Sequence, residues 1–202
     1  MIKALKLLIV IIGSTLVGLG IAIAITCGFG ADPITVLWDG ISRVLPITVG
    51  QASMILAVLM LSAVFILDKK QINIGTVVNP FVVGLSTDFF VGFNINSDSF
   101  IINIILLLLG LVILGFGLAL YASADFGRGS YEALILAVVK KSKVKLVYVR
   151  YCFDFVFLII GLVLGAKLSI GPVVAFLGLG YVIQAFMSMF EKSNIFAQIS
   201  RT

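Results

Sequence analysis

The sequence predicts an all-α protein that crosses a membrane several times. Of its 202 residues, 61% are hydrophobic and only 11% are charged, and the mean hydropathy is +1.26. Soluble domains are about half apolar and about a quarter charged. A spanning helix needs roughly 20 apolar residues and satisfies its own backbone hydrogen bonds in hydrocarbon. Six segments look able to span, near residues 5–27, 48–67, 74–93, 100–123, 146–165 and 169–190.

Two further segments are predicted to form helices that are too short to span comfortably. Residues 32–45 (DPITVLWDGISRVL) follow the first long segment, and residues 129–139 (GSYEALILAVV) follow the fourth. A helix rises about 1.5 Å per residue, so the longer of the two reaches only ~21 Å. Each is expected to be a re-entrant or half helix, although a tilted span in a thinned bilayer remains an alternative.

The two halves of the chain repeat one pattern of span, short helix, span and span. The repeat is marked in the first half by Gly18, Gly20, Phe29-Gly30, Ile74-Gly75 and Gly84. These align in the second half with Gly115, Gly117, Phe126-Gly127, Ile170-Gly171 and Gly180, first at an offset of 97 residues and, from Ile74 on, at an offset of 96. We therefore expect two repeats, residues 1–96 and 97–202, within one integrated membrane domain. Such repeats are typical of transporters and are either parallel or inverted.

The basic residues favour the inverted arrangement. If the short helices do not cross and the N-terminus is cytoplasmic, twelve of the fourteen Lys and Arg lie inside, and only Arg43 and Lys167 lie outside. If the short helices cross, the split is ten to four. Since cytoplasmic loops are enriched in Lys and Arg, we expect inverted repeats with both termini cytoplasmic. This placement also accounts for the net charge of +5 without nucleic acid as a partner.

The glycine-rich turns before the short helices supply the first candidate site residues. A helix that starts inside the membrane leaves N–H groups and a positive dipole end free for a ligand, and glycine allows close approach. We name Asp32, Thr35, Gly129 and Glu132 as candidate substrate or ion ligands. For Asp32 we favour the simpler role of an N-cap before Pro33. Glu132 is either a functional carboxylate at membrane depth or a partner of the helix dipole.

Other polar residues within the spans are candidates with structural alternatives. Asp88 and Gln184 occupy equivalent positions, where they either line a shared cavity or form ordinary polar helix ends. Pro80 is a candidate hinge, because proline frees a carbonyl and bends a helix, but it is also common in membrane helices. Arg150 and Asp154 are four residues apart and are expected to form an ion pair, which we favour over a relay.

The sequence gives little indication of an enzyme. Histidine, the commonest general base and metal ligand, is absent. Cys27 and Cys152 lack the spacing of a metal site or a redox pair and are expected to be packing residues. We recognise no pair of nucleophile and base, and we therefore expect no catalysis, no metal and no cofactor.

Five motifs mark the two units. The first unit carries GFGADPITVLWDGISRVLPITVGQ and INIGTVVNPFVVGLSTDF, and the second carries GLALYASADFGRGSYEAL, VRYCFD and LGAKLSIGPVVAFLGLGYVIQAF. In this order, over nearly the whole chain, they resemble the YczE/YyaS/YitT family of bacterial membrane proteins, which implies the bacterial inner membrane. That family's pattern has a proline after the loop glycines and an acidic residue two positions later. Here Thr35 stands at the first acidic position and Ser130 at the second proline position.

These expectations favour a small secondary transporter or translocator of an unidentified metabolite, ion or lipid. Two inverted repeats support alternating access, because exchanging their conformations converts an inward-open into an outward-open state. The alternative is a non-transporting accessory or scaffold protein for a synthase, sensor or export system. A polar internal path favours the transporter, and a dry packed interface the scaffold. The expected partners are the lipid bilayer and one small substrate, and association into homo-oligomers is left open.

Overall fold

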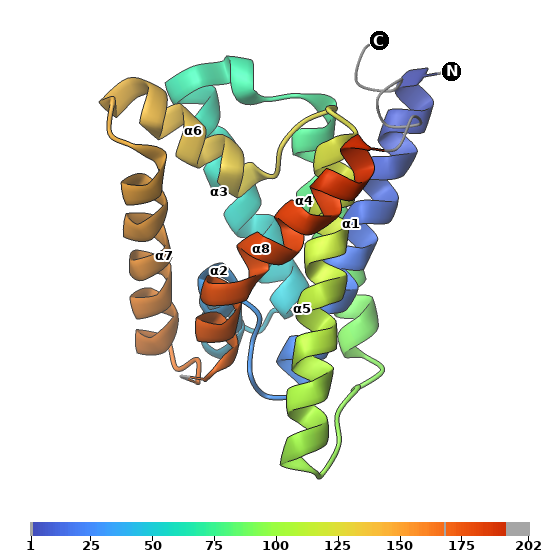
Figure 1. Cartoon of the computed structure of the whole chain (residues 1–202). Helices are drawn as coiled ribbons and strands as arrows, with labels where there is room; N and C mark the ends of the chain where they lie inside the picture. The colour runs from blue at the N-terminus through green and yellow to red at the C-terminus, as the bar shows by residue number, and fades with distance from the viewer. Residues whose placement is uncertain (1, 168, 193–202) are drawn as a thin grey trace.

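The computed structural model describes residues 2–167 and 169–192, and every regular element within them is helical (Figure 1). The elements are α1 (Ile2–Thr26), α2 (Pro33–Val44), α3 (Val49–Asp68), η1 (Lys69–Gln71), α4 (Ile74–Val91), α5 (Phe100–Ser123), α6 (Ser130–Ser142), α7 (Leu146–Val163) and α8 (Gly171–Glu191). Among the described helices, α1, α3, α4, α5, α7 and α8 are long and apolar enough to cross a membrane. The chain is therefore an all-helical, multi-pass membrane protein.

The two remaining helices are as short as the sequence predicts. α2 has 12 residues and α6 has 13, which corresponds to about 18–20 Å at 1.5 Å per residue. α2 begins with a capping box, in which the backbone N–H of Thr35 donates to Asp32 Oδ1 at 3.0 Å and that of Asp32 donates to Thr35 Oγ1 at 2.8 Å. α6 has no side-chain cap, because Gly129 precedes it. The first turn of α6 therefore keeps N–H groups that no capping side chain accepts.

α1 and α5 cross in close antiparallel contact. A Cβ added to Gly13 would lie 2.8 Å from the backbone nitrogen of Tyr121, and one added to Gly20 would lie 2.5 Å from the carbonyl oxygen of Gly110. The early part of α1 thus meets the late part of α5, so the two helices run in opposite directions (Figure 1). Small residues allow this approach, as expected for packing between membrane helices.

The other helices pack around this pair, and several contacts made by one half have counterparts in the other half. α4 packs against α1, and α8 packs against α5. Each short helix contacts a long helix from the other half of the chain, because α2 lies on α7 and α6 lies on α3. At the first of these contacts a Cβ on Gly40 would lie 2.6 Å from the carbonyl oxygen of Gly161. The two halves are therefore interlocked, and neither forms a separate body.

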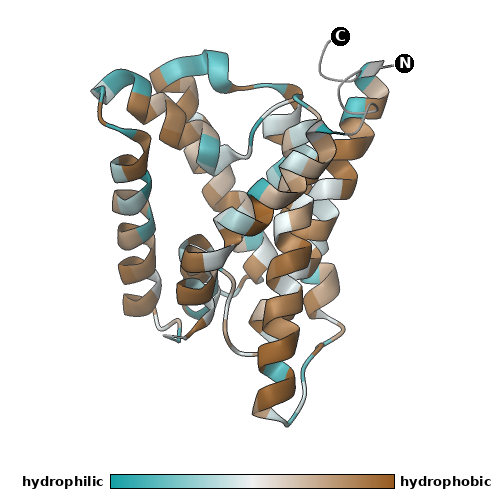
Figure 2. Cartoon of the chain, in the orientation of Figure 1, coloured by the Kyte–Doolittle hydropathy of each residue, from teal (hydrophilic) through white to brown (hydrophobic). Residues whose placement is uncertain are grey.

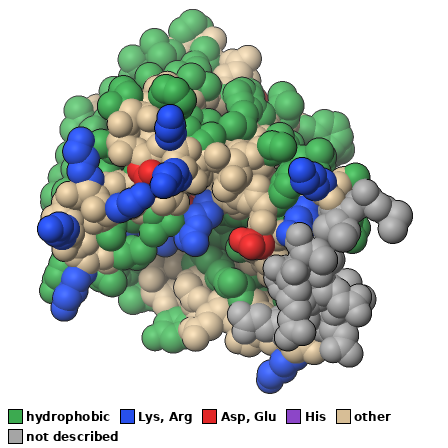
Figure 3. All heavy atoms as spheres, turned by 90° about the horizontal axis from the view of Figure 1, so that it is seen from above, with side chains coloured by type: hydrophobic (Ala, Val, Ile, Leu, Met, Phe, Trp, Pro, Cys, Tyr) green, Lys and Arg blue, Asp and Glu red, His purple; other side chains and the backbone are tan. Residues whose placement is uncertain are grey.

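Many of the basic residues lie at one end of the molecule. Figure 2 shows apolar residues along the long helices and hydrophilic ones concentrated near the ends of α3 and α6. Viewed from that end, Figure 3 shows Lys and Arg side chains over much of the face. Lys140 of α6 joins Asp68 of α3 there, with Nζ 2.7 Å from Oδ2. Arg201, which the charge argument counts as cytoplasmic, lies outside the described residues.

A methyl group at the α1–α5 crossing is expected to be costly. Gly20→Ala places its Cβ against the backbone of α5, which cannot rotate away, and overpacking of this kind costs about 1–3 kcal/mol. The matched control is Gly178→Ala, where no described atom lies within 4 Å of the new Cβ. Alanine is a better helix former than glycine by roughly 1 kcal/mol, so the control should be neutral or stabilising. Thermal unfolding in detergent measures both, and equal melting temperatures would contradict the crossing.

Candidate substrate site

A cavity lies at the centre of the molecule, where the two short helices begin, and its largely apolar wall carries a group of polar side chains. Its volume is about 100 Å³, which is enough for several water molecules or a small ion. Each of the eight α-helices in the described part of the chain contributes to its wall. Its polar lining residues are Asp32, Ser53, Asn79, Tyr121, Gly129, Ser130, Tyr131, Glu132 and Arg150.

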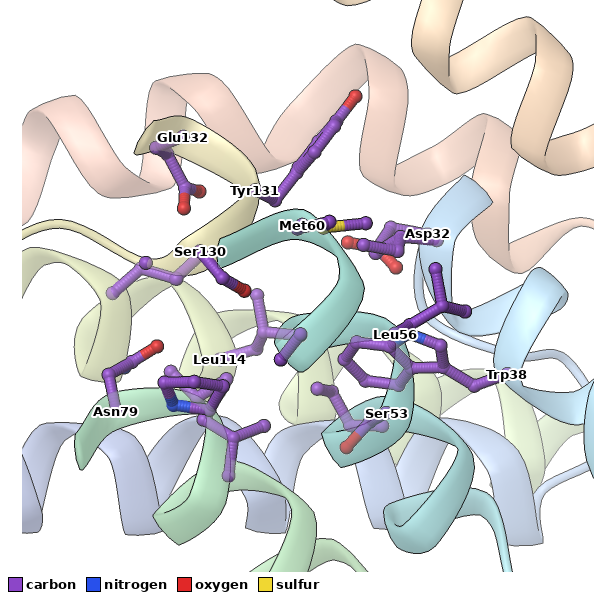
Figure 4. Close-up of a pocket in the computed structure, with 18 of the residues that line it drawn as sticks. Asp32, Trp38, Ser53, Leu56, Met60, Asn79, Leu114, Ser130, Tyr131 and Glu132 are labelled. Carbon is purple, nitrogen blue, oxygen red and sulfur yellow. The ribbon is translucent and has the colours of Figure 1, made fainter. Parts of the chain in front are cut away.

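Asp32 lines the cavity from the start of α2. Its Oδ1 accepts the backbone N–H of Thr35, so the carboxylate caps the helix while it also faces the cavity (Figure 4). The Thr35 hydroxyl accepts the N–H groups of Ala31 and Asp32 and donates to the carbonyl of Asp32 at 2.7 Å. Thr35 is 1% exposed and does not line the cavity. It therefore holds the turn that places Asp32.

Glu132 lines the cavity from the start of α6. Figure 4 places it across the cavity from Asp32, with Ser130 and Tyr131 on the same turn. The Glu132 carboxylate folds back over Gly129, where an added Cβ would lie 2.3 Å from Oε2 and 3.2 Å from the Tyr121 hydroxyl. A side chain at position 129 would displace both groups. Gly129 thus makes room for a carboxylate at the uncapped start of α6.

A second group of charges adjoins the cavity on α7. Arg150 and Asp154 form the expected i, i+4 pair, with Nε 3.7 Å from Oδ2. The Tyr131 hydroxyl donates to the other carboxylate oxygen of Asp154 at 2.5 Å, which joins α6 to α7. Arg150 lines the central cavity, and it lines a neighbouring pocket together with Asp32 and Asp154. The pair therefore borders the spaces beside α7 as well as forming a contact within one helix.

The cavity wall contains a buried donor that no described group accepts. Trp38 on α2 is 9% exposed, and its indole Nε1 is fully buried without a hydrogen-bond partner. Leaving such a donor unpaired costs about 1–3 kcal/mol. Trp38 lines the cavity beside Asp32. A ligand or a water with an acceptor atom in the cavity would relieve this cost.

The remaining candidates have other surroundings. Asp88 does not line the cavity and instead holds the start of α3, because its carboxylate accepts the backbone N–H of Gly50 at 2.7 Å and the Thr48 hydroxyl. Gln184 is also absent from the lining of the cavity. Asp88 thus fits the alternative role of a polar helix end, close to Val91 at the end of α4. Neither residue lines the cavity that was the other alternative. Pro80 does line the cavity, and α4 continues through it without a break.

A structural role for Asp88 predicts a loss of stability. Asp88→Ala leaves the Thr48 hydroxyl and the Gly50 N–H without their acceptor, which is expected to cost roughly 1–3 kcal/mol. Asp88→Asn keeps an acceptor oxygen and should lose less. Thermal unfolding of the three proteins tests this order, and an Asp88→Ala variant as stable as the wild type would contradict it.

Sequence reasoning missed several lining residues. Trp38, Ser53 and Tyr121 carry no local signal, because each belongs to an apolar run and reaches the cavity only through tertiary packing. Tyr131 could have been found from its place in the first turn of the second short helix. Within the described ranges, no group of three or more His, Cys, Asp or Glu residues is placed to hold a metal ion.

The chain is similar to proteins that are themselves uncharacterised. Residues 4–188 match the family of unknown function DUF6198. The uncharacterised protein YyaS of Bacillus subtilis is 27% identical over 184 residues, 90% of this chain and 92% of its own. An uncharacterised protein of Haemophilus influenzae is 23% identical over 184 residues, covering 91% and 84%. The uncharacterised membrane protein YczE of Bacillus subtilis is 25% identical over 138 residues, covering 68% and 64%. The predicted family resemblance is confirmed, and no solved structure matches.

Proposed function

We propose that this chain, which belongs to the family of unknown function DUF6198, is a small secondary transporter. In this proposal two inverted repeats enclose the central cavity. One observation carries the proposal. The starts of both short helices meet at one cavity that contains polar side chains and to which every described α-helix contributes. A re-entrant helix in a bilayer needs its irregular start buried in protein or facing water, and this cavity provides such a place.

Two features of the packing support the inverted arrangement. α1 and α5 hold equivalent positions in the two halves and run antiparallel. The contacts of α2 with α7 and of α6 with α3 are equivalent under the same exchange of halves. An inverted repeat relates elements in this way, with its axis in the membrane plane.

A difference between the halves supports alternating access. α3 and α4 are in contact near Gly50 and Gly84, where a Cβ on Gly84 would lie 2.7 Å from the Gly50 carbonyl oxygen. At the same end, the Asp88 carboxylate accepts a hydrogen bond from the Thr48 hydroxyl and so holds α4 to the start of α3. In the second half α7 and α8 are far less closely packed, and no described atom lies within 4 Å of a Cβ on Gly180, the counterpart of Gly84. Exchanging these two arrangements would close one end of the cavity and open the other.

The proposal includes a topology with both termini in the cytoplasm of a bacterium. Single cysteines at Lys69 and Asn96, in a protein that lacks Cys27 and Cys152, are expected to react with an impermeant thiol reagent from opposite sides. Lys69→Cys should be labelled only from inside and Asn96→Cys only from outside, as the positive-inside rule requires. Labelling of position 69 from outside would contradict the inverted arrangement and favour parallel repeats.

The function is tested by access to the cavity from both sides. Ser130 lines the cavity at the start of α6 and is 8% exposed. In the same cysteine-free background, a transporter that alternates should expose Ser130→Cys to a small impermeant reagent from either side of the membrane. The positions 69 and 96 serve as controls for sidedness. A scaffold has no need of such access, so protection from one side or both would favour the accessory role.

A further inference from the structure

An apolar groove follows the gap between α7 and α8. Its volume is about 300 Å³, and its apolar lining includes Phe155 and Leu158 of α7 and Val173 and Phe176 of α8. Phe155, Val173 and Phe176 are 64%, 58% and 55% exposed. In a membrane such side chains face lipid, so the groove opens towards the acyl chains of the bilayer.

The groove adjoins a pocket that contains charged side chains. This polar pocket has a volume of about 240 Å³, and its lining combines the side chains of Asp32, Arg150, Asp154 and Tyr131 with apolar residues of α8. Groove and pocket share Pro33, Tyr151, Asp154 and Phe176. The rings of Tyr151 and Phe176 lie 5.4 Å apart between their centres, across α7 and α8. This aromatic pair therefore borders the neck between an apolar and a polar space.

The polar pocket in turn adjoins the central cavity. The residues common to both are Asp32, Tyr131, Arg150 and Leu179. A series of adjoining spaces thus extends from the lipid-facing groove, past the aromatic pair, to the starts of α2 and α6. A water-soluble substrate would make no use of its apolar end.

The order of these spaces along α7 matches the orientation of a lipid. α7 begins at Leu146, and Arg150 lies about one turn, ~6 Å, inside it. Leu158 lies about 12 Å deeper along the helix axis at 1.5 Å per residue. Charged groups thus lie nearer the basic end of the molecule, and apolar ones lie deeper. A membrane amphiphile in that leaflet has its head and tail in the same order.

The charges of the polar pocket favour an amine in the head. Asp32 and Asp154 contribute two carboxylates, and Arg150 contributes one guanidinium. Asp154 is already engaged by Arg150 and Tyr131, whereas Asp32 accepts a backbone N–H through Oδ1. One negative charge is left in excess at a depth where unpaired charge is costly. An ammonium group of the ligand would balance it.

We infer that the gap between α7 and α8 is a lateral opening through which the protein takes an amine-bearing membrane amphiphile, with its head at Asp32, Arg150 and Asp154 and an acyl chain in the groove. This inference rests on the proposed function and names the class of its substrate. The Tyr151–Phe176 pair then lies where head and chain join.

The test uses purified full-length protein in detergent and three probes. These are dioctanoyl phosphatidylethanolamine, dioctanoyl phosphatidylglycerol, which lacks the amine, and glycerophosphoethanolamine, which lacks the chains. A ligand that binds the folded protein raises its melting temperature in a concentration-dependent way. The phosphatidylethanolamine is expected to act at concentrations at least tenfold lower than either of the others. An equal effect of glycerophosphoethanolamine, or no effect of the phosphatidylethanolamine, would overturn the inference.

Matched variants locate the effect. Val173→Trp fills the groove, and Leu177→Trp places the same ring one turn further along α8, at a 66% exposed position outside the groove. The first should weaken the response to phosphatidylethanolamine at least tenfold, and the second should leave it unchanged. Asp32→Asn keeps a residue able to cap α2 and should remove the preference over phosphatidylglycerol. Equal losses in the two Trp variants would contradict an acyl chain in the groove.

The same measurements separate the two proposals. If glycerophosphoethanolamine stabilises the protein as well as the lipid does, the inference of a membrane amphiphile is wrong. The proposed transporter function then still stands, with a soluble amine as its substrate. If the lipid binds as expected but Ser130→Cys reacts from one side only, the binding site stands and alternating access fails.

Discussion

Glu132→Gln is expected to weaken substrate recognition strongly and to leave the fold intact. Glutamine has nearly the shape of glutamate, so it can still fold back over Gly129 beside Tyr121. What it loses is the negative charge at the cavity wall. A hydrogen bond to a charged group is worth about 1.5–3 kcal/mol, which corresponds to roughly 10–100-fold in affinity. A compound that stabilises the wild type should therefore need about 10–100-fold higher concentrations in the variant.

The measurement is a thermal-shift titration with whichever ions, metabolites or amphiphiles raise the melting temperature of the wild type. Asp125→Asn is the matched control, because Asp125 is an exposed residue of the loop between α5 and α6 and does not line the cavity. It should titrate like the wild type. Unchanged affinity in Glu132→Gln would mean that Glu132 only complements the dipole of α6, a contribution of about 0.3–1 kcal/mol to stability.

Much of the fold follows from hydrophobic length and repeated glycines. The predicted spans coincide with the six long helices to within a few residues at most ends, and the short segments 32–45 and 129–139 correspond to α2 and α6. These features are local, because span length and helix-start residues can be read from neighbouring positions. The capping role of Asp32 is local in the same sense, since Pro33 and Thr35 lie within the same turn.

The rest depends on contacts between distant parts of the chain. Asp88 and Gln184 look alike in the sequence, but only Asp88 has the Thr48 hydroxyl and the Gly50 N–H within reach. The hydrogen bond from the Tyr131 hydroxyl to Asp154 joins α6 to α7, and no local sequence pattern encodes the relative position of these two helices. The looser packing of α8 on α7 is equally invisible, because the sequence predicts the same pattern for both halves.

This difference between equivalent helices is the central observation for mechanism. In the first half Asp88 and the glycine contact close the end of the cavity at the start of α3. In the second half the corresponding end, at the start of α7, is not closed in the same way. A rigid scaffold would keep this difference permanently. An alternating transporter must reverse it, so that α7 and α8 approach as α3 and α4 part.

Crosslinking between α7 and α8 tests that reversal most directly. α3 begins at Val49 and α7 at Leu146, an offset of 97, so Val147 is the counterpart of Gly50. Gly180 is the counterpart of Gly84 at the offset of 96 found in this later part of the repeat. Val147→Cys with Gly180→Cys, in a membrane preparation of the cysteine-free protein, is expected to crosslink with a short bifunctional thiol reagent in a fraction of molecules. Asp88→Ala should raise that fraction, because it weakens the opposite closure. The control pair is Tyr151→Cys with Phe176→Cys, which already lie at a contact. Efficient crosslinking of the control with none between positions 147 and 180 would contradict alternating access.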